Sequence, residues 1–138
     1  DKIFTRLGAQ DNIVMGKSTF MMEMDDVASV LKNATPKSLV VLDELGRGTS
    51  TLDGMAIAKA TLLFILKQVR CLTMTATHYR PLALELQSIP KVSAKFMSCL
   101  TGPNEHRVSF LYKLTPGVSP KSFGLNVALM AGINQEVF

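Results

Sequence analysis

Residues 38–54, "SLVVLDELGRGTSTLDG", contain the clearest indication of how this chain folds. It contains four consecutive apolar residues, 39–42, which lead directly into Asp43 and Glu44. A run that is apolar on both faces is typical of a strand in the middle of a parallel sheet. Open α/β sheets bind their ligands at the carboxyl ends of the strands. We therefore expect Asp43 and Glu44 to lie at a binding edge.

Strands and helices are predicted to alternate around this central strand. Residues 3–7 are strand-like, and "CLTMTATHY", residues 71–79, predicts a third strand that ends at His78. A helix over residues 54–69 is apolar nearly all round, which predicts that it is well buried, and Asp53 is its expected cap. Residues 18–34 predict another helix, because apolar residues recur on one face: Phe20, Met24, Val27, Ala28 and Leu31.

The pattern changes in the C-terminal part of the chain. Residues 92–100 and 107–115 alternate like two paired strands, and residues 101–104 supply the turn between them. A short helix is expected to start at Ser119 and Pro120 and to end at Gly132, with Asn134 capping a further helix. The alternation of strands and helices predicts an α/β domain with a mainly parallel sheet and a C-terminal antiparallel pair.

Composition limits the classes of protein that fit. The 138 residues, 47% of them hydrophobic, suffice for one domain with a core, and no linker is apparent. No apolar run reaches the ~18 residues of a membrane span. The net charge of +4 is interpreted as solvated faces rather than a nucleic-acid patch, because no two basic residues are adjacent. Cys71 and Cys99 have no metal-site spacing and are predicted to be buried thiols in a reducing compartment.

The carboxylates at the end of the central strand are the strongest candidates for chemistry. Asp43 can hold Mg²⁺, usually through water, and Glu44 can orient or deprotonate an attacking water. The alternative is that Asp43 merely caps a turn and that Glu44 is solvated. The hydroxyl-rich "GRGTST" that follows favours the functional interpretation.

His78 ends the next predicted strand, so in a parallel sheet it would emerge at the same edge as Asp43 and Glu44. An imidazole there can donate to a γ-phosphate oxygen as charge builds up during phosphoryl transfer. Taken alone, a histidine at a strand end is more often structural, and His106, in the predicted turn, is interpreted in that way.

The stretch "MGKSTF", residues 15–20, looks like the end of a phosphate-binding P-loop but does not fit one. Asp11 stands where that motif requires its first glycine. Gly16 and Ser18 instead lie at the start of a predicted helix, where backbone N–H groups and the helix dipole favour an anion. The alternative is a serine that only caps the helix.

Together these segments resemble the MutS mismatch-repair ATPases. "FTRLGAQDNIVMGKSTFMMEM" is similar to the segment that leads into the family's signature helix, and "SLVVLDELGRGTSTLDG" to its Walker B and D-loop. "ATHY" resembles its switch histidine, and "KSFGLNVALMAG" its closing helix. The resemblance covers nearly the whole chain, and "DKIFTRLGA" and "VSFLYKLTPG" look closer to the eukaryotic homologues than to the bacterial protein.

The resemblance implies part of an ABC-type P-loop ATPase fold that works as a dimer with ATP and Mg²⁺. Asp43 and Glu44 would lie at the metal, with Glu44 as the catalytic carboxylate and His78 as the γ-phosphate sensor. Ser18 would contact the γ-phosphate held by the partner subunit. The other residues implied to bind the nucleotide are Gly16, Thr19, Gly48, Thr49 and Ser50, together with Asp43.

The resemblance also implies what lies outside the chain. The family's P-loop is not in this sequence and is expected upstream, so residues 1–138 would be the C-terminal portion of the ATPase domain. A second MutS-type subunit, in a heterodimer, is the implied partner. Mismatched DNA would bind through other domains, no membrane is involved, and the expected location is nuclear.

The sequence is also compatible with two other functions. The first is another ABC-type DNA-maintenance ATPase, although the Leu-Ser-Gly-Gly run that begins the signature of those proteins is missing from "NIVMGKSTF". The second is a non-catalytic module that contributes a dimer face and a helix acting on the partner's nucleotide. Micromolar ATP binding by the chain alone would exclude the second.

Overall fold

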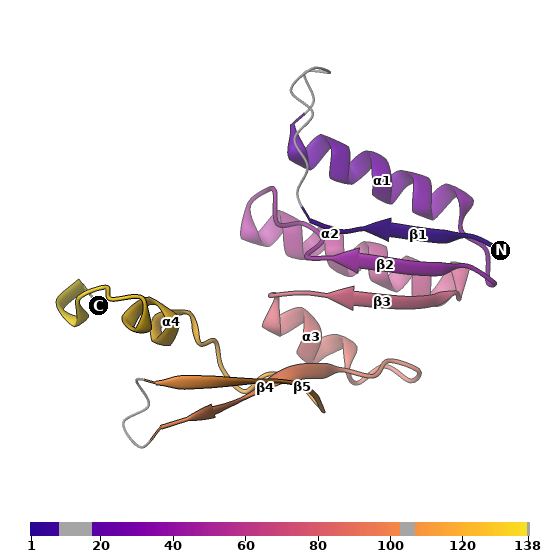
Figure 1. Ribbon diagram of the computed structural model, residues 1–138. Coiled ribbons are helices and arrows are strands. Elements are labelled where there is room, and N and C mark those ends of the chain that lie inside the picture. Colours follow the sequence, from indigo (N-terminus) through magenta and orange to yellow (C-terminus); the bar gives the residue numbers. More distant parts are fainter. Residues whose placement is uncertain (9–17, 103–106, 138) are drawn as a thin grey trace. The chain divides into compact units, whose positions relative to one another are not determined.

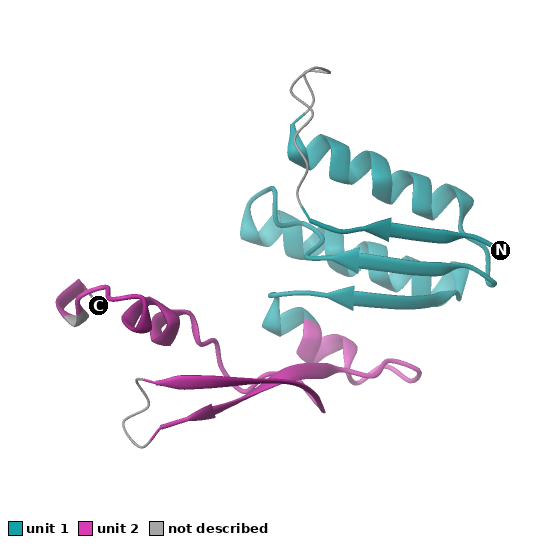
Figure 2. Ribbon diagram, in the orientation of Figure 1, with its two compact units in different colours: residues 1–82 teal, residues 83–138 magenta. Residues whose placement is uncertain are grey.

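The computed structural model describes residues 1–8, 18–102 and 107–137 (Figure 1). The chain divides into two compact units, Asp1–Leu82 and Ala83–Phe138 (Figure 2). The sequence had predicted one domain without a linker. The division falls inside a helix, α3 (Arg80–Leu86), so it leaves no trace of the Gly, Pro or Ser enrichment that marks a flexible linker.

The first unit is built on a parallel sheet of three strands. In the order β1 (Ile3–Arg6), β2 (Leu39–Asp43), β3 (Leu72–Ala76), the middle strand pairs with both neighbours. The predicted parallel sheet with the Leu39–Asp43 strand at its centre is thereby confirmed. The connection from β1 to β2 and the connection from β2 to β3 step across the sheet in the same direction. Right-handed connections that do so place their helices on one face of the sheet.

These two helices cover Val40 and Leu42, which are almost completely buried. They are α1 (Thr19–Asn33) and α2 (Thr51–Phe64), which continues as a π-helical turn over Ile65–Val69. Figure 1 shows α2 behind the strands. On the other face, Ile3, Leu72 and Met74 are exposed, the last two at 70% and 62%. Within the described part of the chain, one face of the sheet is therefore uncovered.

Three details of the predicted helices were wrong. In α1 the buried residues are Glu23, Val27 and Val30, whereas Ala28, expected on the apolar face, is exposed. The cap of α2 is Ser50 instead of Asp53, because the Ser50 hydroxyl accepts the Asp53 N–H at 3.2 Å. Nor is α2 buried all round, since Leu52 and Phe64 are exposed. Helix α3 was not predicted at all.

The second unit contains an antiparallel pair, as predicted, formed by β4 (Lys95–Thr101) and β5 (Val108–Pro116). Helix α4 (Gly124–Met130) begins later than the predicted start at Ser119, whose hydroxyl donates instead to the Lys121 carbonyl. Gly132 lies just beyond the end of α4 with φ +92°, a conformation that suits glycine. Asn134 then caps a short 3₁₀ helix, Gln135–Val137, as expected.

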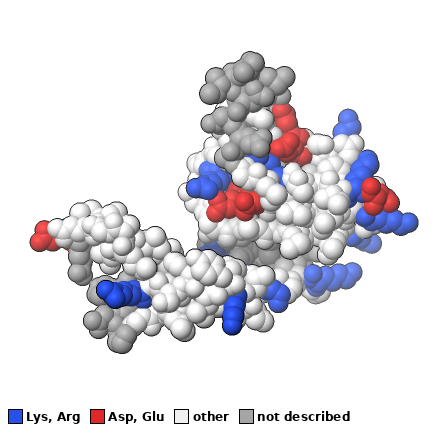
Figure 3. Space-filling view, viewed as in Figure 1, with Lys and Arg blue, Asp and Glu red and all other residues white. Residues whose placement is uncertain are grey.

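Charge and cysteines complete the outline. On the side of the molecule seen in Figure 3, Lys and Arg side chains are scattered among uncharged residues, in line with solvated faces. Cys71 and Cys99 are free thiols but only half-buried, so the prediction that they are buried was wrong. No helix among the described residues is long and apolar enough to cross a membrane.

Candidate functional site

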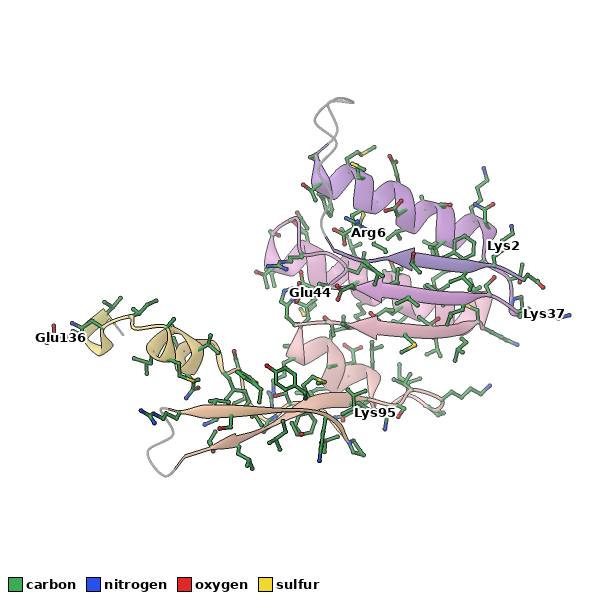
Figure 4. All side chains as sticks on the ribbon, viewed as in Figure 1. Lys2, Arg6, Lys37, Glu44, Lys95 and Glu136 are labelled. Carbon is green, nitrogen blue, oxygen red and sulfur yellow. The ribbon has the colours of Figure 1, made fainter. Side chains whose placement is uncertain are left out.

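The site is built at the carboxyl end of β2. Asp43 is the last residue of that strand and is exposed. Glu44 follows with φ +49°, a left-handed conformation that turns the chain sharply away from the sheet. Its N–H donates to the Ala76 carbonyl at the end of β3 (3.0 Å), which anchors the turn. Figure 4 shows Glu44 at this edge and Lys37 at the opposite end of the strand.

Two basic side chains face the Glu44 carboxylate. Arg47 Nη1 lies 2.7 Å from Oε2, and His78 Nδ1 lies 3.9 Å from Oε1. The His78–Glu44 separation is too long for a hydrogen bond. The structure thus brings together Glu44 and His78, which come from different strands. Arg47 was missed by the sequence reasoning, although it lies inside the "GRGTST" loop. The Arg47–Glu44 pair is exposed, and exposed ion pairs contribute little to stability. The Glu44 carboxylate can therefore readily exchange Arg47 for another partner.

The loop that carries Glu44 is fixed at Gly46. Glu23 Oε1 accepts the Gly46 N–H (2.6 Å), and the Tyr79 hydroxyl donates to the Gly46 carbonyl (2.8 Å). Gly46 has φ +89°, and its backbone packs so closely against Gly54 of α2 that neither residue has room for a Cβ. Sequence reasoning missed Glu23 and Tyr79; the available signal for Glu23 was a charged residue beside the apolar stripe of α1.

Burial raises the pKa of the Tyr79 hydroxyl, and the negative charges of Glu23 and then Glu44 raise it further. The hydroxyl therefore keeps its proton at neutral pH and serves as a donor. Its ring also stacks at an angle against His78, with 4.1 Å between the ring centroids. Tyr79 thus contacts both the glutamate loop, at Gly46, and the histidine.

Ser18 caps α1: its hydroxyl accepts the Met21 N–H at 3.2 Å, and its carbonyl accepts the Met22 N–H. The structure therefore shows the capping role that the sequence left open. A capping hydroxyl uses one of its lone pairs, and its hydrogen remains a separate donor function. Thr19 is the first residue of the helix. Gly16, like Asp11, Lys17 and His106, lies outside the described residues.

The other predicted nucleotide contacts lie around the start of α2. The Ser50 hydroxyl accepts the Asp53 N–H and donates to the Asp53 carboxylate (2.7 Å), so it is engaged in capping. A Cβ on Gly48 would come within 3.2 Å of Phe20, which shows that this loop lies against the first turn of α1. Thr49, which lies between Gly48 and Ser50 in the sequence, is half-buried. Their predicted contacts with a nucleotide stay a prediction.

The residues present fit a magnesium ion that is shared with phosphate. Among the described residues, no group of three or more His, Cys, Asp and Glu side chains could hold a metal by itself. Mg²⁺ commonly takes only one or two carboxylates and fills its octahedron with water and phosphate oxygens. The exposed Asp43 carboxylate, with Glu44 next to it, matches that partial donor set.

Comparisons with known proteins agree with the sequence resemblance. A family model described as MutS domain V matches residues 1–138. The chain is 50% identical to the DNA mismatch repair protein MSH7 of Arabidopsis thaliana, covering 99% of this chain and 13% of that protein. It is 48% identical to msh3 of Aspergillus oryzae, covering 96% and 12%. It is also 48% identical to MutS of Chloroflexus aurantiacus, covering 99% and 14%. The chain therefore spans about an eighth of the length of these relatives.

Proposed function

Since the chain belongs to the MutS family of DNA mismatch repair proteins and is of the eukaryotic homologue type, we propose that it forms part of an ATPase site that hydrolyses ATP to ADP and phosphate. One observation carries this proposal: Glu44 and His78, from the ends of two adjacent parallel strands, lie 3.9 Å apart beside the exposed Asp43. We also propose that the chain is the C-terminal portion of an ABC-type P-loop ATPase domain, and that the protein is located in the nucleus.

The side chains divide the chemistry between them. Asp43 and Glu44 would hold Mg²⁺, which when bound neutralises charge on the phosphate oxygens. Glu44 would orient the attacking water and accept its proton. The Nδ1 atom of His78 faces Glu44, which leaves Nε2 as the ring nitrogen that donates to the γ-phosphate. Arg47 would have to release the Glu44 carboxylate, which its exposed position allows.

The nucleotide is proposed to lie between two subunits. The sequence contains no complete P-loop, so the main phosphate cradle would come from another segment of the protein. The start of α1, at Ser18, would contact the γ-phosphate of ATP held by a second MutS-type subunit, in a heterodimer. ATP bound in this way would couple mismatch recognition, by other domains, to repair signalling.

The test is Glu44→Gln in the full-length protein that contains this chain, assembled with its partner subunit. The amide keeps the shape of the side chain but is a far weaker base, so turnover should fall ~10²–10⁴-fold while ATP binding persists. Glu136→Gln, in the C-terminal 3₁₀ helix, is the matched control and should hydrolyse at the normal rate. Normal steady-state hydrolysis by the Glu44 variant would refute the proposed role.

A further inference from the structure

Two buried side chains from different parts of the first unit, Glu23 and Tyr79, form hydrogen bonds to the backbone of Gly46. We call this pair of side chains the clamp. Glu23 comes from α1 and Tyr79 follows β3, and their exposed fractions are only 6% and 4%. Glu23 binds the N–H of Gly46 and Tyr79 binds its carbonyl. These two groups belong to the peptide units on either side of the Gly46 Cα, so together the bonds fix both backbone dihedrals of this residue.

A buried carboxylate is a costly way to satisfy one loop N–H, because it loses its hydration when it is buried. Most loop N–H groups are satisfied by carbonyls, short polar side chains or water. The short bond from Gly46 to Glu23 is of the charge-assisted type, which is stronger and more directional than a neutral one. Such a bond holds the loop in one place more firmly than solvent would.

The clamped residue lies two positions after Glu44. The N–H of Glu44 is itself anchored to the end of β3. The turn that carries the carboxylate is thus tied at Glu44 and again at Gly46. Tyr79 also stacks against His78, so it contacts the His78 ring directly and the loop that carries Glu44 through the Gly46 carbonyl.

We propose that Glu23 and Tyr79 are positioning residues that set the distance between the Glu44 and His78 side chains. They hold the loop that carries Glu44 through the Gly46 peptide groups, and Tyr79 holds the His78 ring by stacking. This inference rests on the proposed function. Neither residue touches the nucleotide in this scheme. Glu23 also connects the loop to α1, the helix whose first turn is proposed to meet the partner's ATP.

The experiment compares Glu23→Ala, Glu23→Gln and Tyr79→Phe in the full-length protein with its partner subunit. Single-turnover hydrolysis, ATP dissociation constants and thermal unfolding midpoints are measured for each. Misplacing a catalytic group by about 1 Å can cost ~10²-fold in rate, so Glu23→Ala should slow hydrolysis about 10- to 100-fold. Losing the single Tyr79 hydrogen bond should slow it about 3- to 10-fold. ATP affinity should change less than about threefold in all cases.

Rescue separates positioning from a purely structural role. Glu23→Gln keeps a carbonyl oxygen that can accept the Gly46 N–H, so it should recover most of the rate lost in Glu23→Ala. Two controls are matched. Asp26→Asn removes another carboxylate of α1, which pairs with Arg6, and Tyr112→Phe removes an exposed phenol hydroxyl. Both should hydrolyse ATP normally.

Several results would overturn the inference: a normal rate in Tyr79→Phe, rate and affinity falling together, or Glu23→Gln being no better than Glu23→Ala. If Glu23→Ala does not fold, Tyr79→Phe decides: slower hydrolysis with unchanged ATP affinity supports the inference, and a normal rate overturns it. The two proposals fail differently. Normal hydrolysis by Glu44→Gln would remove the proposed function and this inference with it. Loss of activity in Glu44→Gln together with normal Glu23 and Tyr79 variants would remove the inference alone.

Discussion

Replacing Gly54 by alanine tests the close packing between the glutamate loop and α2. In an ordinary helix interior this change stabilises by about 0.5–1 kcal/mol, because glycine loses more backbone entropy on folding. Gly54 is not in ordinary surroundings. A Cβ there would lie nearer than 3.0 Å to both the Gly46 carbonyl oxygen and the Tyr79 hydroxyl, and the first of these is backbone that cannot swing aside.

The magnitude follows from three contributions. Overpacking a tight interior costs about 1–3 kcal/mol. Breaking the Tyr79–Gly46 hydrogen bond leaves a buried carbonyl unsatisfied, at a cost of about 1–3 kcal/mol. The gain in helix propensity offsets up to about 1 kcal/mol of this. With each range taken near its middle, the net expectation for Gly54→Ala is a local destabilisation of about 3 kcal/mol, opposite in sign to the usual result of Gly→Ala in a helix.

Hydrogen exchange followed by mass spectrometry in the full-length protein provides the assay. Peptides covering β2, the loop and α2 should exchange about 30- to 1,000-fold faster, since each 1.4 kcal/mol is a factor of ten. Gly124→Ala in α4 is the matched control, because the nearest atom to its Cβ would be at an ordinary 3.7 Å. That change should leave exchange equal or slower. Unchanged or slower exchange in Gly54→Ala would refute the packing argument.

Three further predictions concern the site. His78→Ala should lower the rate of hydrolysis by about 10²-fold with a much smaller change in ATP affinity, because its donor acts mainly in the transition state. His106→Ala is the control. An equal loss of ATP affinity would assign His78 to ground-state binding. Ser18→Ala should slow single-turnover hydrolysis at the partner's site about 10- to 100-fold, from a donor contribution of about 1.5–3 kcal/mol. Ser18→Gly preserves most of the capping stability, so it should be as slow as Ser18→Ala if a phosphate contact is lost and nearly normal if only the cap matters. The raised pKa of Tyr79 predicts stability that is intact below the ordinary value of 10.0 and is lost as the pH rises through the higher folded-state pKa; denaturant unfolding at alkaline pH should show that loss, and Tyr79→Phe should lack it.

The sheet could be predicted from the sequence because its signal is local. The apolar run that ends at Asp43 marks a buried parallel strand, and strand ends in a parallel sheet share an edge, which predicted that His78 would approach Glu44. The clamp on Gly46 could not be predicted in this way. It depends on Glu23 and Gly46, which lie far apart in the chain, and on the rotation of α1 by which Glu23, and not Ala28, turns inward.

Caps and boundaries were predicted less well, for physical reasons. Ser50 and Asp53 bond to each other at the start of α2, so either residue type is a plausible cap from sequence, and the backbone conformation decides. Helix α3 is seven residues long, which is too short for the helical period to show clearly. The division between the two units lies inside that helix, where no change of composition marks it.

The uncovered face of the parallel sheet has a practical consequence for handling this chain. Among the described residues, β1 and β3 are the outer strands of this sheet, and an apolar surface beside such edges is a template for self-association. When the chain is produced by itself, we expect oligomers in light scattering and strong binding of hydrophobic dyes. Lysine at Leu72 and Met74 should suppress both. In the full-length protein, the same two lysines would lower the stability of the fold only if another layer covers this face. Comparing the two preparations therefore shows whether both faces of the sheet are covered in the full-length protein.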